Sequence, residues 1–293
     1  MIIVTGANGQ LGRAIVEELL KRMPADQVGV SVRDPEKAQD LARRGVRVRR
    51  GDFDDAPSLS QSFEGASQVL LISSNSGGEN AVRQHSAAID AAKGVGVGRI
   101  LYTSHVGASS HSPFSPMIDH AATEAALKAS GVAFTVLRNG FYASTVSFLL
   151  GRALTTGELA LPEDGPVSWT SHADLAEATA VLLATNALLP TKDAENRVVN
   201  LTASQAFDFQ AVASLASEVL GRPIVRAVVT DEAFLSGMVS QGVPEVRAAM
   251  TLGIFRASRL GQFALIDPAL PRLLGRPPVL LGPYLRTALA LGK

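Results

Sequence analysis

The sequence contains no cysteine, which excludes disulfides, thiolate nucleophiles, iron–sulfur clusters and cysteine-ligated zinc. It also lacks net charge, with 27 basic and 27 acidic residues, so no overall field attracts nucleic acid or an anionic membrane. No basic leader precedes Gly6, and no stretch approaches the roughly 20 apolar residues of a membrane helix. We therefore expect a cytoplasmic monomer or homodimer that acts on a small molecule.

The first half of the chain alternates short β-branched runs with longer helical patterns, which is typical of βαβ units and a parallel sheet. Helices are predicted over residues 10–22 and 35–44, the second with Asp34 as N-cap and Pro35 in its first turn. Strands are predicted over residues 2–5, 27–32, 46–50, 68–72, 99–103 and 133–137. The pattern predicts an α/β fold, a Rossmann doubly wound parallel sheet.

The regular alternation of strand and helix patterns ends at about residue 139. Residues 157–162 and the Gly165-Pro166 turn suggest a short antiparallel excursion, and residues 197–201 suggest one more strand of the sheet. Further helices are predicted over residues 171–184, 207–220, 231–241 and 244–257, and a strand over residues 223–229. We expect an NAD(P)-binding lobe over residues 1–150, while residues 151–293 return in part to the sheet and form a smaller, mainly helical substrate lobe.

A glycine-rich segment joins the first strand to the first helix with the pattern G-x-x-G-x-x-G. In such a loop Gly6 can form the tight turn, Gly9 lets a pyrophosphate approach the backbone, and Gly12 lets the helix pack close to the sheet. The helix N-terminus then presents free N–H groups to the phosphates. Glycines also serve plain turns, but a position between strand and helix is the context that the motif requires. The candidate dinucleotide contacts here are Gly6, Asn8, Gly9, Gln10, Leu11 and Gly12.

The end of the second strand should distinguish the two nicotinamide cofactors. An acidic residue there would hold the ribose diol of NAD(H), whereas an arginine would accept the 2′-phosphate of NADP(H). The chain offers both, as Arg33 and Asp34. Because Asp34 has a ready role as helix cap before Pro35, we favour Arg33 as the phosphate ligand and NADP(H) over NAD(H).

Polar residues also follow the third, fourth and fifth strands, where ligands of such sheets bind. Asp52 could accept from the adenine amine and Phe53 could pack on the ring, although a polar loop with an anchoring phenylalanine explains them equally well. The remaining candidates are the hydroxyl residues Ser73, Ser74, Thr103 and Ser104, which would face the ribose and nicotinamide half of the cofactor.

Over nearly its whole length the chain resembles the NmrA-like group of atypical short-chain dehydrogenases, which includes bacterial type 2 NAD(P)H:quinone oxidoreductases and triphenylmethane reductases. The motifs that carry the resemblance are residues 4–12, 32–38, 71–74, 102–104, 137–142 and 273–278. The most particular of them is Leu137-Arg138-Asn139-Gly140-Phe141-Tyr142.

The resemblance implies bound NADPH and hydride delivery to a quinone or a similarly flat, conjugated acceptor. It further implies a nicotinamide and acceptor pocket lined by Asn139, Gly140, Phe141 and Tyr142. The alternative for the two aromatic residues is a turn whose side chains enter the core. The NADPH contacts that it implies are Gly6, Asn8, Gly9, Gln10, Leu11, Arg33, Asp52, Ser74 and Thr103.

The chain departs from ordinary short-chain dehydrogenases in lacking their Tyr-x-x-x-Lys pair. None of its three tyrosines has a lysine four residues on, and alanines stand at the corresponding helix positions, Ala121 and Ala125. The plausible local proton donors are His105, His120 and Tyr142, of which His105 and Tyr142 are our catalytic candidates. The histidines show no metal-ligand spacing.

Hydride addition to a quinone or a cationic dye yields a product that solvent can protonate, so an enzyme without a dedicated acid remains possible. The missing pair equally allows a non-catalytic NAD(P)-sensing regulator. It argues against a sugar-nucleotide epimerase or dehydratase, which needs the acid/base pair.

Overall fold

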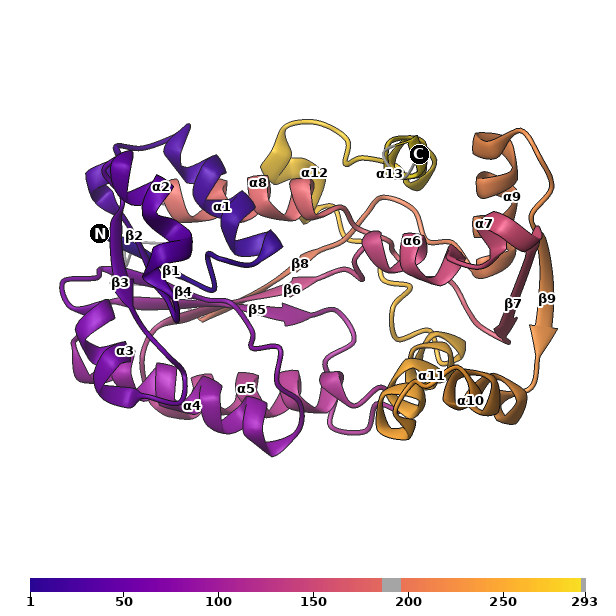
Figure 1. The fold of residues 1–293 in the computed structure, drawn as a ribbon. Coiled ribbons are helices and arrows are strands. Elements are labelled where there is room, and N and C mark those ends of the chain that lie inside the picture. Colours follow the sequence, from indigo (N-terminus) through magenta and orange to yellow (C-terminus); the bar gives the residue numbers. More distant parts are fainter. Residues whose placement is uncertain (186–195, 291–293) are drawn as a thin grey trace.

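The computed structural model describes residues 1–185 and 196–290, and its main feature is one large sheet with helices on both faces (Figure 1). The strands of this sheet are β1 (Ile2–Thr5), β2 (Val28–Val32), β3 (Arg47–Arg50), β4 (Gln68–Leu71), β5 (Arg99–His105), β6 (Phe134–Asn139) and β8 (Arg197–Leu201). They lie in the order β3-β2-β1-β4-β5-β6-β8, and every neighbouring pair is parallel. The order reverses between β1 and β4, where doubly wound folds bind ligands. The predicted Rossmann fold is confirmed.

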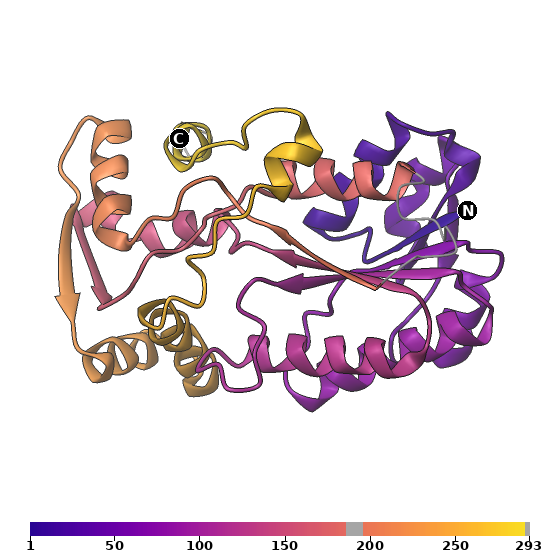
Figure 2. The ribbon, with the colours of Figure 1, turned by 180° about the vertical axis from the view of Figure 1, so that it is seen from behind.

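Helices cover both faces of the large sheet (Figure 2). One face carries α1 (Gln10–Leu20), α2 (Gln39–Arg43), α8 (His172–Ala184) and α12 (Ala269–Leu274), and the other carries α3 (Ala56–Phe63), α4 (Glu79–Gly94) and α5 (Pro116–Ser130). Every residue of β1, β2 and β4 is buried, because a parallel sheet covered on both faces hides both sets of side chains. β1 and the last three residues of β4 are accordingly β-branched or apolar, whereas β2 alternates valine with Gly29 and Ser31.

The predicted helix over residues 35–44 is split into two pieces. A 3-10 turn over Pro35–Ala38 precedes α2, and Asp34 caps the turn by accepting a hydrogen bond from Glu36 N at 3.2 Å. The predicted role of Asp34 as a cap is confirmed.

A small lobe follows β6, and we use this name for the elements that surround a second, two-stranded sheet at one end of the molecule (Figure 1). These elements are α6 (Ser144–Leu150), α7 (Ala153–Thr156), β7 (Glu158–Pro162), α9 (Phe209–Leu220), β9 (Val225–Val229), α10 (Asp231–Ser240) and α11 (Glu245–Arg259). The last helix, α13 (Leu281–Ala290), packs against α6 and α9. Among the described residues, no helix is long and apolar enough to span a membrane.

The prediction of an antiparallel excursion over residues 157–162 was wrong, since β7 pairs with β9 in parallel. A hairpin would pair β7 with the segment directly after it, but its partner follows only after α8, β8 and α9, a crossover that brings the chain back in the same direction. Gly165 instead packs on α11, where a Cβ would come within 2.3 Å of Ser258 O. The predicted return of residues 197–201 to the large sheet is confirmed as β8, while the lobe boundary at residue 150 stays a prediction.

Candidate dinucleotide and acceptor site

The glycine loop between β1 and α1 is a tight turn that only glycine can complete. Gly6 has a φ of +63°, and its carbonyl accepts a hydrogen bond from Gly9 N at 2.9 Å. A Cβ at Gly12 would lie 2.4 Å from that same carbonyl oxygen, closer than any side chain tolerates. No side chain caps the N-terminus of α1, so its first N–H groups are available for an anion.

The end of β2 lies beside this loop. Asn8 Nδ2 donates to Asp34 O at 2.9 Å, which joins the loop to the turn after β2. The carboxylate of Asp34 is occupied by its cap and by Lys37 at 3.4 Å. Arg33 is exposed, and among the described residues its guanidinium forms no hydrogen bond or ion pair. The arrangement leaves Arg33 free to meet a phosphate.

Asp52 and Phe53 lie in the turn after β3. Asp52 Oδ1 accepts from Asp54 N at 3.1 Å, and Oδ2 lies 3.9 Å from Arg50, so the carboxylate also stabilises its own turn. The ring of Phe53 meets His85 edge to face, with centroids 6.4 Å apart. These contacts are those of the polar loop and its anchoring phenylalanine, and a role at the adenine stays a prediction.

The ends of β4 and β5 are joined by side-chain hydrogen bonds. Ser73 N donates to Thr103 Oγ1 at 3.0 Å. Ser74 N donates to His85 Nε2 at 2.8 Å, while its hydroxyl donates to Gln84 at 2.5 Å. The structure thus brings Ser73, Ser74 and Thr103 together at the predicted edge, and α4 holds Ser74 in place through His85 and Gln84.

Ser104 is directed differently from its neighbour Thr103. Its hydroxyl donates to Glu124 Oε1 at 2.6 Å, and Glu124 is held in turn by Arg138, with hydrogen bonds of 2.9 and 2.6 Å. The hydroxyl proton of Ser104 is therefore used in the hydrogen bond to α5 and is not free to be donated to the cofactor. The predicted contact of Ser104 with the cofactor stays a prediction.

The ends of β5 and β6 carry two buried polar atoms that have no partner. His105 and Asn139 stand opposite each other in the register of these strands. His105 Nδ1 accepts from Gly107 N at 3.1 Å, but His105 Nε2 and Asn139 Oδ1 lack a hydrogen-bond partner among the described residues. Buried polar atoms are nearly always paired, which makes these two atoms candidate ligand contacts at the carboxyl edge of the sheet.

The residues after Asn139 surround this point. A Cβ at Gly140 would lie 2.2 Å from Thr170 Oγ1, so the chain passes close to the loop before α8. Phe141 is 7% exposed, and its ring packs on Phe263 and Trp169 with centroids 5.1 and 5.5 Å away. Phe141 thus belongs mainly to the aromatic core of the small lobe, the alternative raised from the sequence, although its ring also lies 5.1 Å from that of His105.

Tyr142 remains partly accessible, and its ring packs on His172 with centroids 4.2 Å apart. Burial raises the pKa of Tyr142, and the nearby Asn139 amide offsets part of this effect. Its hydroxyl therefore keeps its proton at neutral pH.

Comparisons with known proteins identify the family of this chain. A family model described as NAD(P)H-binding matches residues 6–186. Quinone oxidoreductase 2 of Escherichia coli is 33% identical over 278 residues, which are 94% of each chain. An NmrA-like family domain-containing oxidoreductase of Aspergillus flavus is 30% identical over 285 residues, 94% of this chain and 91% of that protein.

The chain belongs to the NmrA-like, NAD(P)H-binding family. The structure of the Citrobacter sp. triphenylmethane reductase complexed with NADP(H) superposes on this NmrA-like protein with a TM-score of 0.88 and 33% identity, over 98% of this chain and 100% of that one. The predicted family membership is confirmed.

In the NmrA-like protein, His105 and His120 are neutral at pH 7. Burial, with a smaller effect from His120, lowers the pKa of His105 to about 3, and burial lowers the pKa of His120 to about 4. His120 Nδ1 is hydrogen bonded to Tyr102 Oη at 2.7 Å, and burial raises the pKa of Tyr102 well above its ordinary value. None of these groups changes charge near neutral pH, so each serves as a fixed hydrogen-bonding dipole.

Sequence reasoning missed His85 and His172, which support Ser74 and Tyr142 respectively. His85 Nδ1 is hydrogen bonded to Thr123 at 2.8 Å, and burial lowers the pKa of His85 to about 4. Its place on the buried face of α4, four residues after Ala81 and three before Ala88, is a signal that helical periodicity could have supplied. No pattern around His172 marks it, because its partner comes from another segment.

Proposed function

We propose that this protein is an NADPH-dependent reductase that delivers hydride to a quinone or a similarly flat, conjugated acceptor at the ends of β5 and β6. The proposal rests on His105 Nε2 and Asn139 Oδ1, which lack hydrogen-bond partners among the described residues and lie at the edge that the glycine loop also faces. Relatives that align along nearly the whole chain are named as a quinone oxidoreductase and a triphenylmethane reductase, which supports this acceptor class.

The residues of the glycine loop fit the cofactor's pyrophosphate. Gly6, Gly9 and Gly12 leave the backbone bare at the uncapped N-terminus of α1. Arg33 supplies a free guanidinium for the 2′-phosphate, and its planar fork suits that dianion. Ser73, Ser74 and Thr103, which lie together at the strand ends, would contact the ribose. Asp52 and Phe53 would flank the adenine. When bound, NADPH supplies the hydride.

The protein's own groups position the acceptor and its protons. His105 is neutral, and with Nδ1 accepting from Gly107 its other nitrogen can carry the proton and donate to a carbonyl oxygen. Tyr142 keeps its phenolic proton and offers a second donor at the mouth of the site. The rings of Phe141 and Phe263 exclude water behind His105. Solvent completes protonation, since no charged acid stands at the Tyr-x-x-x-Lys positions.

Turnover tests this proposal directly. Purified protein should consume NADPH faster than NADH when it is given 1,4-benzoquinone or a triphenylmethane dye. Asn139→Leu should lower turnover, whereas the matched variant Gln262→Leu should not. Among the described residues the side chain of Gln262 is hydrogen bonded only to Ser112, at 2.6 Å. If the protein bound NADPH tightly but oxidised it with neither acceptor, the result would contradict the reductase and favour the non-catalytic NAD(P)-sensing regulator.

We further expect a small-molecule substrate, a cytoplasmic location and a monomer or homodimer. Light scattering of the purified protein with and without NADPH measures the oligomeric state, and fractionation of the source cells measures the location. Because the chain has no net charge, we expect it not to bind nucleic acid. A stable complex with nucleic acid in a band-shift assay would contradict this expectation.

A further inference from the structure

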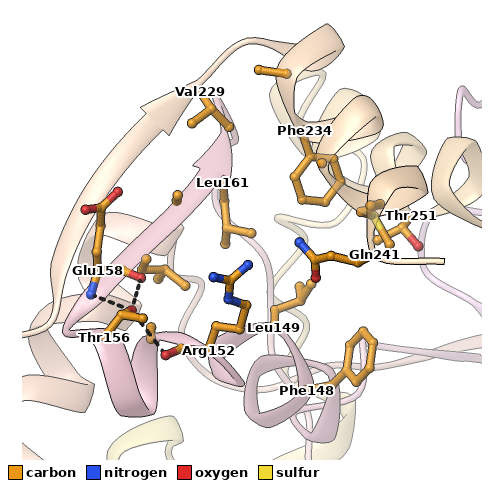
Figure 3. Close-up of a pocket in the computed structure, with 16 residues that line it drawn as sticks. Phe148, Leu149, Arg152, Thr156, Glu158, Leu161, Val229, Phe234, Gln241 and Thr251 are labelled. Carbon is orange, nitrogen blue, oxygen red and sulfur yellow. Dashed lines mark hydrogen bonds between the residues drawn. The ribbon is translucent and has the colours of Figure 1, made fainter. Parts of the chain in front are cut away.

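The small lobe contains a cavity of about 480 Å³ between α6, α7 and β7 on one side and α10 and α11 on the other (Figure 3). Its volume lies within the usual range of small-molecule sites. None of the residues that line it is a candidate contact for the dinucleotide or for the acceptor, so it is separate from the site at the ends of β5 and β6.

Most of the cavity wall is apolar. Leu149 from α6 and Leu161 from β7 face Phe234 from α10 across it (Figure 3). Met238 of α10 also lines the cavity, and Phe148 is 74% exposed at its rim. Burying such a large aromatic surface against a ligand is favourable by roughly 25 cal/mol per Å². This wall suits a flat aromatic or alicyclic body.

Two hydrogen-bond donors point into the space between these walls. The guanidinium of Arg152 and the amide of Gln241 approach each other from opposite sides of the cavity (Figure 3). Among the described residues Arg152 forms no ion pair, and only its backbone carbonyl is engaged, by Thr155, Thr156 and the Thr156 hydroxyl. The one acidic lining residue, Glu158, turns its carboxylate away from Arg152 (Figure 3).

This combination is complementary to an amphipathic anion. Arg152 is solvated at the mouth of the cavity, so an acidic group can pair with it there through two parallel hydrogen bonds while the apolar body enters the wall region. We propose that the small-lobe cavity is a second binding site, distinct from the redox site, for a small aromatic acid that carries one carboxylate.

The test uses 2-naphthoate, its neutral isostere 2-naphthamide and the NADP⁺-saturated protein, with binding followed by calorimetry. We expect one molecule of naphthoate per chain, with a dissociation constant at least about tenfold lower than that of the amide. Arg152→Gln should weaken naphthoate at least about tenfold and leave the amide unchanged, and Arg152→Lys should fall between. Phe234→Ala should weaken both compounds, since it removes part of the shared wall.

Arg247→Gln is the matched control, because Arg247 is an exposed arginine on α11 that does not line the cavity, and it should leave both affinities unchanged. Equal binding of acid and amide, an undiminished affinity in Arg152→Gln, or no binding up to about 1 mM would overturn the proposal. Competition between naphthoate and the quinone acceptor would overturn the separation of the two sites. None of these results depends on turnover, so they stand or fall independently of the reductase.

Discussion

Replacing Gly12 with alanine should damage both stability and cofactor binding. The added Cβ would lie 2.4 Å from Gly6 O and 2.8 Å from Gly6 C, whereas ordinary contacts begin near 3.4 Å, so the loop and α1 must separate by about an ångström. Overpacking of this kind costs about 1–3 kcal/mol. Because Gly6 O also accepts from Gly9 N, the displacement opens the turn that presents backbone N–H groups to the phosphates.

Two measurements on the same sample test this prediction. Thermal unfolding should show the melting temperature of Gly12→Ala lowered by roughly 5 °C. NADPH titration should show affinity reduced by about tenfold or more, which is ~1.4 kcal/mol. The matched control is Gly94→Ala at the end of α4, where nothing lies within 4 Å of the new Cβ and the helix gains a better former.

The control should bind NADPH normally and melt at the same or a slightly higher temperature. If Gly12→Ala instead matched the parent protein in both measurements, the close packing of loop and helix would be refuted as the reason for the third glycine. A loss of stability with unchanged NADPH affinity would refute the placement of the phosphates at this turn.

Three further predictions follow from the site. Arg33→Ala should weaken NADPH about tenfold to a hundredfold with little change for NADH, as measured by fluorescence titration, because only NADPH carries the 2′-phosphate; equal losses for both would refute the assignment. Tyr142→Phe should lower kcat about tenfold or more if the phenol donates to the acceptor, and steady-state rates equal to those of the parent would remove it from the mechanism. The free energy of unfolding should fall as pH drops from about 6.5 to about 4. Burial lowers the pKa values of His85, His105 and His120 to about 4, 3 and 4, so in this range the unfolded chain binds more protons than the folded one. Urea unfolding at pH 7, 5.5 and 4.5 checks this, and a flat profile would contradict the burial of these rings.

The sequence predicted the large sheet well because its signals are local. β1 and β2 are short runs rich in β-branched residues, and the glycine loop combines strand, turn and helix within a dozen residues. The cap at Asp34 was equally local, since Pro35 follows it directly. The direction of β7 could not be predicted in this way, because its partner β9 lies more than sixty residues further along the chain. A strand's pattern shows which face is buried and says nothing about its neighbour.

In the candidate site, too, local features could be predicted from the sequence and contacts between distant segments could not. Residue identity and strand ends correctly placed Ser73, Ser74, Thr103, His105 and Asn139 at one edge of the sheet. The direction of the Ser104 side chain could not be predicted in this way. Side chains alternate along β5, so Ser104 points toward Glu124 on α5, a partner twenty residues away. The core packing of Phe141 depends on Phe263, which is more distant still, and only the assembled small lobe brings the two rings together.

This alternation also explains how the fold can dispense with the Tyr-x-x-x-Lys pair. Tyr102 and Ser104 project from one face of β5 and are hydrogen bonded to His120 and Glu124 of α5, which makes the β5–α5 contact a buried, structural one. Alanines stand where the tyrosine and lysine would project from that helix. The candidate groups for chemistry are then His105 and Tyr142 at the ends of β5 and β6, which are neutral at pH 7. In the proposed function they orient the acceptor by hydrogen bonding. Such a site suits acceptors whose reduction does not require protonation in the hydride-transfer step, and it should reduce simple ketones poorly for the same reason.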